Sequence, residues 1–502
     1  MTMASLTLYP DEERLAGTDR LVFNLYLITG LVLFVLMMLL GLGMRWTQAQ
    51  WLGVPSNWFY QLLSMHGAGM VGTSVMITTA TMWFFLRKYV TLHLWAFAAN
   101  YVLFMLGALC IIGAIFGGGY AALWTFLYPL PMQGMGMWSP GASALFMLGY
   151  LLIGVGSLIF YFDAAAGIIK VHGNLGRALG LQWLFGGTIN QDHPKAVVAS
   201  TSMVIANSLG ILAGAVALVM SLAAIFFPEV KLDMVLIKAL IYWFGHMYIN
   251  AAIYMGVIGI YELLPRYTHR PYGLSRAFLW GWATTSTLVI IVFPHHLLMD
   301  FAVPHWMLVM GQIASWGSGF PVVVVTTWGA LSNIYKADFK WSLPPMLLIL
   351  SLFGWVTGGF GAFLDSTIVV NLTMHNTQWV PGHFHFYLLL GVVAMTLGFI
   401  YHVVGDRSPE TVQSGLGGKV FWLYFAGALV FLFGFLDGGR LSVPRRMAER
   451  IDAWIFTDQV GAVGGTLVFL AMLYFAARLT AGLLQTRAPA GAGRAGAAHA
   501  AR

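Results

Sequence analysis

Residues 374–386 read MHNTQWVPGHFHF, and apolar sequence continues from them to residue 404. The stretch is long enough for a transmembrane helix, and it places His383 and His385 two residues apart near one end. At about 100° per residue, positions two apart leave an α-helix on roughly opposite sides. Because histidine in a membrane span is costly, it marks a functional site by default. One helix is therefore predicted to hold two separate metal centres, one on each flank.

The rest of the chain has the composition of a membrane protein. Of its 502 residues, 59% are hydrophobic and 9% are charged, and the mean hydropathy is +0.79, which excludes a soluble domain. We expect an all-α polytopic membrane protein with twelve transmembrane helices. The apolar stretches that can each cross a core of ~30 Å lie near 20–43, 58–84, 97–117, 143–165, 198–227, 235–262, 274–294, 303–331, 343–364, 374–404, 418–437 and 459–485.

These spans are predicted to form one catalytic domain at 20–485, after an N-terminal segment at 1–19 and before a disordered, Ala- and Gly-rich tail at 486–502. An even number of spans puts both termini on one side. Most of the 25 Lys and Arg residues fall on that side, so both termini are predicted to be cytoplasmic. The single cysteine excludes an internal disulfide and a two-cysteine copper site. No basic run is interleaved with aromatic residues, so no nucleic-acid partner is expected.

Seven of the fourteen histidines fall in the outer half of the membrane on this topology, and they come from four helices. They are His66, His246, His295, His296, His375, His383 and His385. A low-spin haem needs two axial histidines, a gas-binding haem needs one and an open face, and three histidines suit copper. Two such haems and one copper ion would together need six histidine ligands, and six of these seven histidines are good candidates. Four arginines, Arg440, Arg445, Arg446 and Arg450, also fall outside, which indicates either an anionic ligand or a solvated loop.

Five motifs together resemble subunit I of the haem–copper oxidase superfamily. They are YWFGHMYIN at 242–250, FPHHLLMD at 293–300, the stretch quoted above, WTFLYPLP at 124–131 and VPRR at 443–446. The closest branch is the B-type, in which HNT-x-WVPGHFH is distinctive, and the resemblance runs through all twelve predicted spans.

The resemblance implies a role for each of these residues. His66 and His385 would be the axial ligands of a low-spin haem, expected to be haem b. His383 would be the proximal ligand of a high-spin haem. Copper B would be held by His246, His295 and His296, and haem propionates would meet His375, Arg445 and Arg446. The implied partners are a small membrane-anchored subunit II with a cupredoxin-like domain and an external donor such as cytochrome c or a blue-copper protein. The implied location is a bacterial or archaeal cell membrane.

The sequence departs from the oxygen-reducing members of this branch at two places. Those members carry a tyrosine four residues after the first copper histidine, on the same helix face, where this chain has Asn250. Asparagine cannot supply the electron and proton that the tyrosine gives. The B-type proton path resembles a line of hydroxyl groups, and here the matching positions are Val257, Val322 and Val325.

Both departures favour members that reduce nitric oxide to nitrous oxide, because this two-electron reaction needs no tyrosine. Asn250 is then expected to be a catalytic residue that donates a hydrogen bond to the bound gas, alongside His246 and His383. Its alternative role is a hydrogen bond to neighbouring backbone. The alternative activity is that of a B-type cytochrome c oxidase, reducing oxygen to water with proton pumping, whose tyrosine comes from another helix. A haem-binding sensor without turnover would not need three copper histidines.

Overall fold

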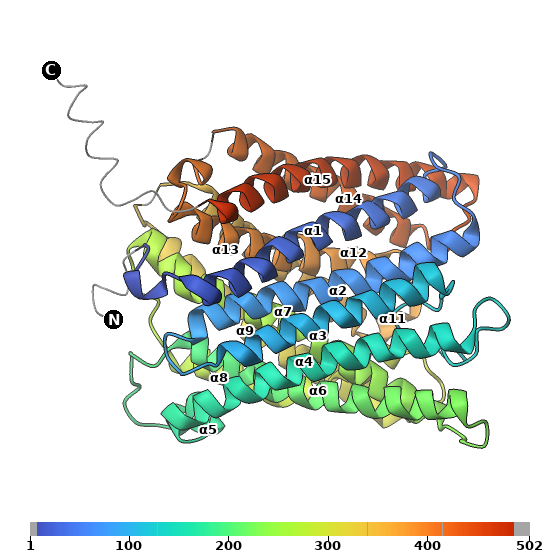
Figure 1. Cartoon of the computed structure of the whole chain (residues 1–502), viewed down its shortest axis with the longest axis horizontal. Coiled ribbons are helices and arrows are strands. Elements are labelled where there is room, and N and C mark those ends of the chain that lie inside the picture. The colour runs from blue at the N-terminus through green and yellow to red at the C-terminus, as the bar shows by residue number, and fades with distance from the viewer. Residues whose placement is uncertain (1–7, 128, 339, 414, 486–502) are drawn as a thin grey trace.

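The computed structural model describes residues 8–127, 129–338, 340–413 and 415–485. Its helices lie side by side with their axes in roughly one direction (Figure 1). In chain order, the α-helices are α1 (Gly17–Gln48), α2 (Ser56–Leu86), α3 (Leu94–Ile112), α4 (Pro140–His172), α5 (Leu175–Ala178), α6 (Lys195–Phe226), α7 (Met234–Thr268), α8 (Arg276–Leu288), α9 (His305–Ile334), α10 (Leu343–Asp365), α11 (Ile368–Met374), α12 (Trp379–His385), α13 (Ala394–Gly405), α14 (Gly415–Arg440) and α15 (Asp452–Leu484). The all-α membrane class is confirmed.

Eleven helices in the described part of the chain are long and apolar enough to cross a membrane. The predicted span at 274–294 is the one that differs. Helix α8 ends at Leu288, and the chain continues through the short 3₁₀ segments η5 (Val289–Ile291) and η6 (Phe293–Leu297). Pro294 has no backbone N–H to continue an α-helix. The count of twelve is therefore not confirmed by helix length and stays a prediction.

The beginning of the first long helix and the end of the last long helix lie close together. Helix α1 begins and α15 ends at the same end of the bundle (Figure 1), and Nη2 of Arg20 donates to the carbonyl of Gln485 at 2.7 Å. This is the arrangement that an even number of crossings requires. The predicted disordered tail at 486–502 lies outside the described residues, as does the start of the predicted N-terminal segment.

Three helical stretches form the interior of the bundle. The most apolar window is 83% buried in α2, 89% buried in α7 and fully buried in the stretch Trp379–Gly405, against 33% for Leu94–Gly117. These interior helices carry His66, His246, and the pair His383 and His385. The candidate ligands therefore lie where lipid is excluded, as costly polar groups in a membrane must.

Small residues allow neighbouring helices to approach closely. A Cβ atom on Gly107 of α3 would lie 2.5 Å from the carbonyl oxygen of Gly149 of α4, and one on Gly149 would lie 2.7 Å from that of Gly107. Between α14 and α15, a Cβ on Gly434 would lie 2.7 Å from Cα of Gly461. Such contacts replace the hydrophobic effect, which does not drive helix association within lipid.

The π-helical segment η7 (Phe386–Val393) comes directly after His385 and joins α12 to α13. A second π-helical segment, η3 (Gly113–Gly117), extends α3. Each π-turn adds a residue to the helical turn, and so it rotates the helix on its N-terminal side relative to the helix on its C-terminal side. His383 and His385 lie in α12, on the N-terminal side of η7. Because of this rotation, the directions of their side chains do not follow from the way in which α13 packs.

Candidate metal centre

All six predicted metal ligands line one cavity of about 430 Å³ inside the bundle. They are His66 from α2, His246 from α7, His295 and His296 from η6, and His383 and His385 from α12. His375, Arg445 and Arg446 line the same cavity. The structure thus brings together every candidate cofactor residue that the sequence indicated.

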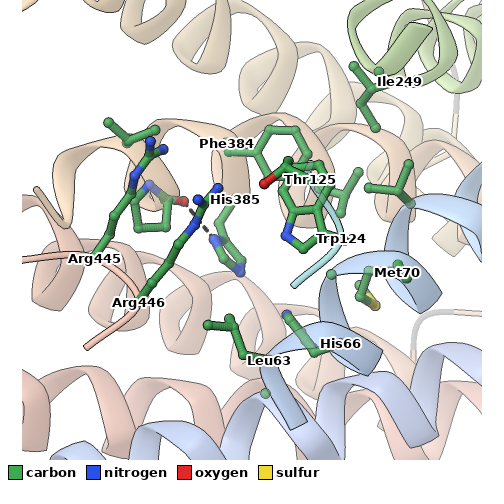
Figure 2. Close-up of a pocket in the computed structure, with 18 of the residues that line it drawn as sticks. Leu63, His66, Met70, Trp124, Thr125, Ile249, Phe384, His385, Arg445 and Arg446 are labelled. Carbon is green, nitrogen blue, oxygen red and sulfur yellow. Dashed lines mark hydrogen bonds between the residues drawn. The ribbon is translucent and has the colours of Figure 1, made fainter. Parts of the chain in front are cut away.

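His66 and His385 face each other across part of this cavity (Figure 2). Their ring centroids are 6.4 Å apart, with 16° between the ring planes. Nδ1 of His66 lies 2.7 Å from the carbonyl of Met37, and Nδ1 of His385 lies 2.6 Å from that of Pro381. A carbonyl can only accept, so each Nδ1 carries the proton and each Nε2 keeps a lone pair. Both rings are therefore prepared to bind one iron between them, as a low-spin haem requires.

The position of His66 depends on a glycine that the sequence motifs did not indicate. A Cβ atom on Gly41 of α1 would lie 2.6 Å from Cε1 of His66, so a larger residue would displace the imidazole. On the other side, the ring of His385 stacks on Phe435 at 5.0 Å between centroids, with 20° between planes. Nothing in the chemistry of either residue type reveals these contacts, because they join helices that are distant in sequence.

His246, His295 and His296 form a group with one ligand atom each, all within 4.8 Å of one another. Nδ1 of His246 lies 3.1 Å from Nε2 of His296, and Nδ1 of His295 is buried with no hydrogen-bond partner among the described residues. An imidazole nitrogen without a partner calls for a ligand, and three converging imidazoles suit copper. Gly311 of α9 permits the approach, since its Cβ would lie 2.6 Å from the backbone nitrogen of His295.

Asn250 lies one helical turn from His246 and contacts that ligand. Its Nδ2 is 2.8 Å from Nε2 of His246, which leaves Nδ1 of His246 directed toward His296. The contact that the structure shows for Asn250 is thus with the side chain of a candidate copper ligand, and not with the neighbouring backbone that the sequence left as an alternative. The expected hydrogen bond from Asn250 to a bound gas stays a prediction.

His383 and His385 leave α12 toward different neighbours, as their spacing predicts. His385 faces His66 and Phe435, whereas Nδ1 of His383 is in ion-pair contact with Asp365 at the end of α10. Asp365 was not among the residues that the sequence indicated. An acidic residue in a membrane span is a signal that the sequence does contain.

Of the four outer arginines, two line the cavity and two form ion pairs elsewhere. Arg445 and Arg446 line the cavity, and they lie to one side of His385 in Figure 2. Arg445 is held in place by Oδ1 of Asn376, which accepts from its Nη2 at 2.8 Å. In contrast, Arg440 is exposed and pairs with Asp437 at 2.8 Å, and Arg450 pairs with the buried Asp458 at 2.6 Å. Two cations therefore face the cavity, as the propionates of a haem require.

The inner halves of α7 and α9 carry the valines at which the sequence departs from a line of hydroxyl groups. Val257 and Val322 are fully buried there. The hydroxyl of Tyr261 is 2.6 Å from that of Thr326, a partner that the sequence motifs did not indicate. The adjacent Glu262 points elsewhere, toward Lys88 and Tyr89. Val257 precedes Tyr261 by one turn in α7, and Val322 precedes Thr326 by one turn in α9, so both valines lie on the side of this hydroxyl pair that leads toward His246.

The chain is similar to known proteins over most of its length. The family model for cytochrome c and quinol oxidase polypeptide I matches residues 22–467. The alternative cytochrome c oxidase subunit 1 of Bradyrhizobium diazoefficiens is 22% identical over 476 residues, covering 86% of this chain and 76% of that protein. Cytochrome c oxidase subunit 1 of Cereibacter sphaeroides is 24% identical over 286 residues, covering 55% of this chain and 49% of that protein.

The corresponding subunit of Thermus thermophilus is 24% identical over 265 residues, with 48% of this chain and 47% of that protein covered, so the chain spans about half the length of these last two relatives. Among solved structures, a chain of a heme-copper terminal oxidase dimer superposes with a TM-score of 0.77 at 19% identity, over 94% of this chain and 85% of that chain. Because the family match extends over most of its length, the protein belongs to the family of cytochrome c and quinol oxidase polypeptide I.

Proposed function

We propose that this haem–copper oxidase subunit is the catalytic subunit of a nitric oxide reductase. In the reaction, two nitric oxide molecules take up two electrons and two protons and give one nitrous oxide and one water. The observation that carries the proposal is the contact of Asn250 with His246 at 2.8 Å. The position next to the copper ligand, where an oxygen-reducing relative would have a redox-active tyrosine, is occupied by a carboxamide that cannot be oxidised.

Each group of residues has its own part in this reaction. His66 and His385 would hold the low-spin haem, expected to be haem b, and His383 the high-spin haem. His246, His295 and His296 would hold copper. The metal groups supply electron transfer and gas binding when present. The chain itself orients His246 through Asn250, encloses the gas in the cavity, and presents Arg445 and Arg446 to the propionates.

The route by which protons could reach the site also supports nitric oxide, rather than oxygen, as the substrate. The buried Val257 and Val322 cannot carry protons from the inner hydroxyl pair of Tyr261 and Thr326. A nitric oxide reductase can take its protons from the outer side, in which case no charge is pumped. Electrons would come from an external donor such as cytochrome c or a blue-copper protein, through a small membrane-anchored subunit II with a cupredoxin-like domain. The expected location is a bacterial or archaeal cell membrane.

The second candidate is an oxygen-reducing cytochrome c oxidase, and one observation favours it. Tyr242 lies one turn before His246, and its ring stacks on His296 at 5.6 Å between centroids. A tyrosine is thus present in the cavity, on the outer side of the copper histidines. Tyr242 belongs to α7, the helix of His246, and so it is not the tyrosine from another helix that the sequence left as an alternative. If Tyr242 nevertheless replaced the missing tyrosine, the oxygen reaction would depend on its hydroxyl.

The test is turnover of the purified complex with each gas, with nitrous oxide measured as product, in native protein and in Tyr242→Phe. We expect nitric oxide to be converted to nitrous oxide at a rate that Tyr242→Phe leaves within about 5-fold. The two-electron reaction takes no electron from this hydroxyl, and the loss of a single neutral hydrogen bond costs about 1 kcal/mol. Rapid oxygen reduction that Tyr242→Phe abolishes would instead establish the oxidase.

A further inference from the structure

Asp365 is an acidic residue inside the membrane that the proposed reaction does not use. It is the last residue of α10, and its side chain is 13% exposed. Both carboxylate oxygens and Nδ1 of His383 are buried, and none of these three atoms has a hydrogen-bond partner among the described residues. Oδ2 of Asp365 and Nδ1 of His383 are nevertheless in ion-pair contact. A buried carboxylate is expensive without a partner, so its place beside an iron-ligand candidate needs a reason.

The sequence of α10 brings Asp365 to that place. A Cβ atom on Gly361 would lie 2.5 Å from Cβ of His383, and one on Gly358 would lie 2.8 Å from Cδ2 of Tyr387. These glycines let α10 rest directly on the helix that carries His383. Asp365 comes four residues after Gly361, so it lies on the same face one turn later. This close approach of the two helices places the carboxylate of Asp365 beside Nδ1 of His383.

His383 differs in this respect from the other two iron-ligand candidates. Nδ1 of His66 and Nδ1 of His385 each donate to a neutral backbone carbonyl. Nδ1 of His383 faces a carboxylate. The acceptor behind a metal-bound imidazole sets how much electron density the ligand gives to the metal, and a carboxylate makes the imidazole more basic than a carbonyl does.

We propose that Asp365 is a positioning residue that accepts the Nδ1 proton of His383 in a hydrogen bond, fixes the plane of its imidazole and lowers the reduction potential of the high-spin haem. A more electron-rich ligand stabilises the oxidised iron relative to the reduced iron. The chain thereby tunes its two haems differently through the groups behind their histidines. The inference rests on His383 as an iron ligand and is independent of the choice between nitric oxide and oxygen.

The charge of Asp365 also acts on other groups of the cavity wall. His296, His375 and Arg445 are all close enough to interact with it electrostatically. Removing the carboxylate could therefore alter a potential through space alone. The experiment needs a control that changes the same charge on the same side of the membrane without touching an imidazole. Asp437 provides it, because it pairs with the exposed Arg440 at 2.8 Å.

The test compares Asp365→Asn with Asp437→Asn in the assembled complex. The readouts are the iron–histidine stretching frequency of the reduced high-spin haem by resonance Raman spectroscopy and its midpoint potential by spectroelectrochemistry. We expect Asp365→Asn to lower the stretching frequency and raise the potential, and to leave the low-spin haem bands in place. Asp437→Asn should leave the stretching frequency at its native value. An unchanged frequency in Asp365→Asn would overturn the proposal.

Two further measurements keep the test decisive. If Asp365→Asn does not assemble, the native complex alone is informative. Its iron–histidine frequency should exceed that of haem proteins whose proximal imidazole donates to a backbone carbonyl, and a frequency equal to theirs would contradict the proposal. His383→Ala tests the underlying assignment separately. If that variant keeps the high-spin haem, His383 is not the ligand and the assignment of the site fails before the role of Asp365 arises.

Discussion

At the scale of single residues, each group of candidate metal ligands is oriented by hydrogen-bond partners of its own. His66 and His385 are oriented by carbonyl groups and face each other, whereas His246 is oriented by Asn250 and faces His296. Separate substitutions should therefore remove separate metals. If a substitution removes one metal and leaves the other two in place, it has removed a ligand and has not unfolded the protein.

Replacing His295 with alanine should remove copper and leave both haems. The three-histidine group loses one of its ligands, and none of its members is placed at an iron. The copper content of purified complex should fall by about one ion per complex, whatever copper other subunits carry, because the group loses one of its three imidazoles. His305→Ala is the control, because His305 is exposed at the start of α9. Full copper in His295→Ala would refute the copper assignment.

Replacing His66 with alanine should abolish the spectrum of the low-spin haem. His385 would then be the only axial ligand on that iron, and a low-spin haem of this kind needs two. The measurement is the difference spectrum of reduced and oxidised complex, with the high-spin bands as internal control. A six-coordinate low-spin signal that survives in His66→Ala is incompatible with the pairing at 6.4 Å.

Replacing Asn250 with tyrosine should lower nitric oxide turnover by about 10-fold to 100-fold, the usual effect of disturbing the partner of a metal ligand. The larger ring would displace the carboxamide that lies 2.8 Å from His246. Oxygen reduction should not appear in its place, because Val257 and Val322 still block protons from the inner side. Asn250→Tyr with native nitric oxide turnover would show that the position has no part in the reaction.

At the scale of helices, close approach between distant segments positions the ligands. Gly41 lets α1 pass beside the ring of His66, and Gly361 lets α10 rest against His383. The sequence motifs predicted the six histidines, because histidine in a membrane and the spacing of His383 and His385 are local signals. They did not predict Asp365 or Gly41, because those contacts depend on how helices far apart in sequence are packed.

A matched pair of glycine substitutions tests this packing. Gly41→Ala places a methyl group 2.6 Å from Cε1 of His66, whereas a Cβ on Gly43 meets nothing within 4 Å. Gly41→Ala should therefore reduce or shift the low-spin haem bands, and Gly43→Ala should not. The helix propensity of the two changes is the same, since both replace Gly by Ala in α1. Identical, native spectra from both variants would mean that α1 does not support the haem pocket.

The limits of hydropathy are also visible at this scale. The predicted span at 274–294 is predominantly apolar, yet α8 ends at Leu288 and 3₁₀ turns come after it. Hydropathy measures how apolar a stretch of sequence is, and it carries no information on the pattern of backbone hydrogen bonds. The turns present His295 and His296 to the cavity beside His246. In this irregular stretch Val289, Val292 and Leu297 are buried, whereas Ile291 is exposed.

At the scale of the whole molecule, a buried ion cluster ties the N-terminal segment to the bundle. Glu13 accepts from Nη1 and Nη2 of Arg266 at 2.6 and 2.5 Å and lies 2.9 Å from Nζ of Lys88. Burial raises the pKa of Glu13, but the hydrogen bonds and charge of Arg266 and the charge of Lys88 outweigh it and lower the pKa from 4.5 to about 2. The cluster joins three segments that are distant in sequence.

Glu13→Gln should therefore destabilise the complex by about 3 kcal/mol near neutral pH, the free energy that corresponds to this pKa shift. A lowered folded-state pKa stabilises the folded protein above pH 4.5, and this contribution disappears as the pH falls toward about 2. The difference in stability between native and variant protein should shrink over that range. Thermal unfolding in detergent measures it, with the exposed Glu12→Gln as control. Equal stability of the two variants at neutral pH would contradict the structural role of Glu13.

The most direct test of the central claim is gas consumption by the native complex in liposomes, with the outer pH recorded at the same time. Asn250 beside the copper ligand and the valines along the inner path predict that nitric oxide is converted to nitrous oxide with no acidification of the outer medium. Rapid four-electron reduction of oxygen to water, with protons released to the outside, would contradict that prediction and show that the protein is an oxygen-reducing oxidase.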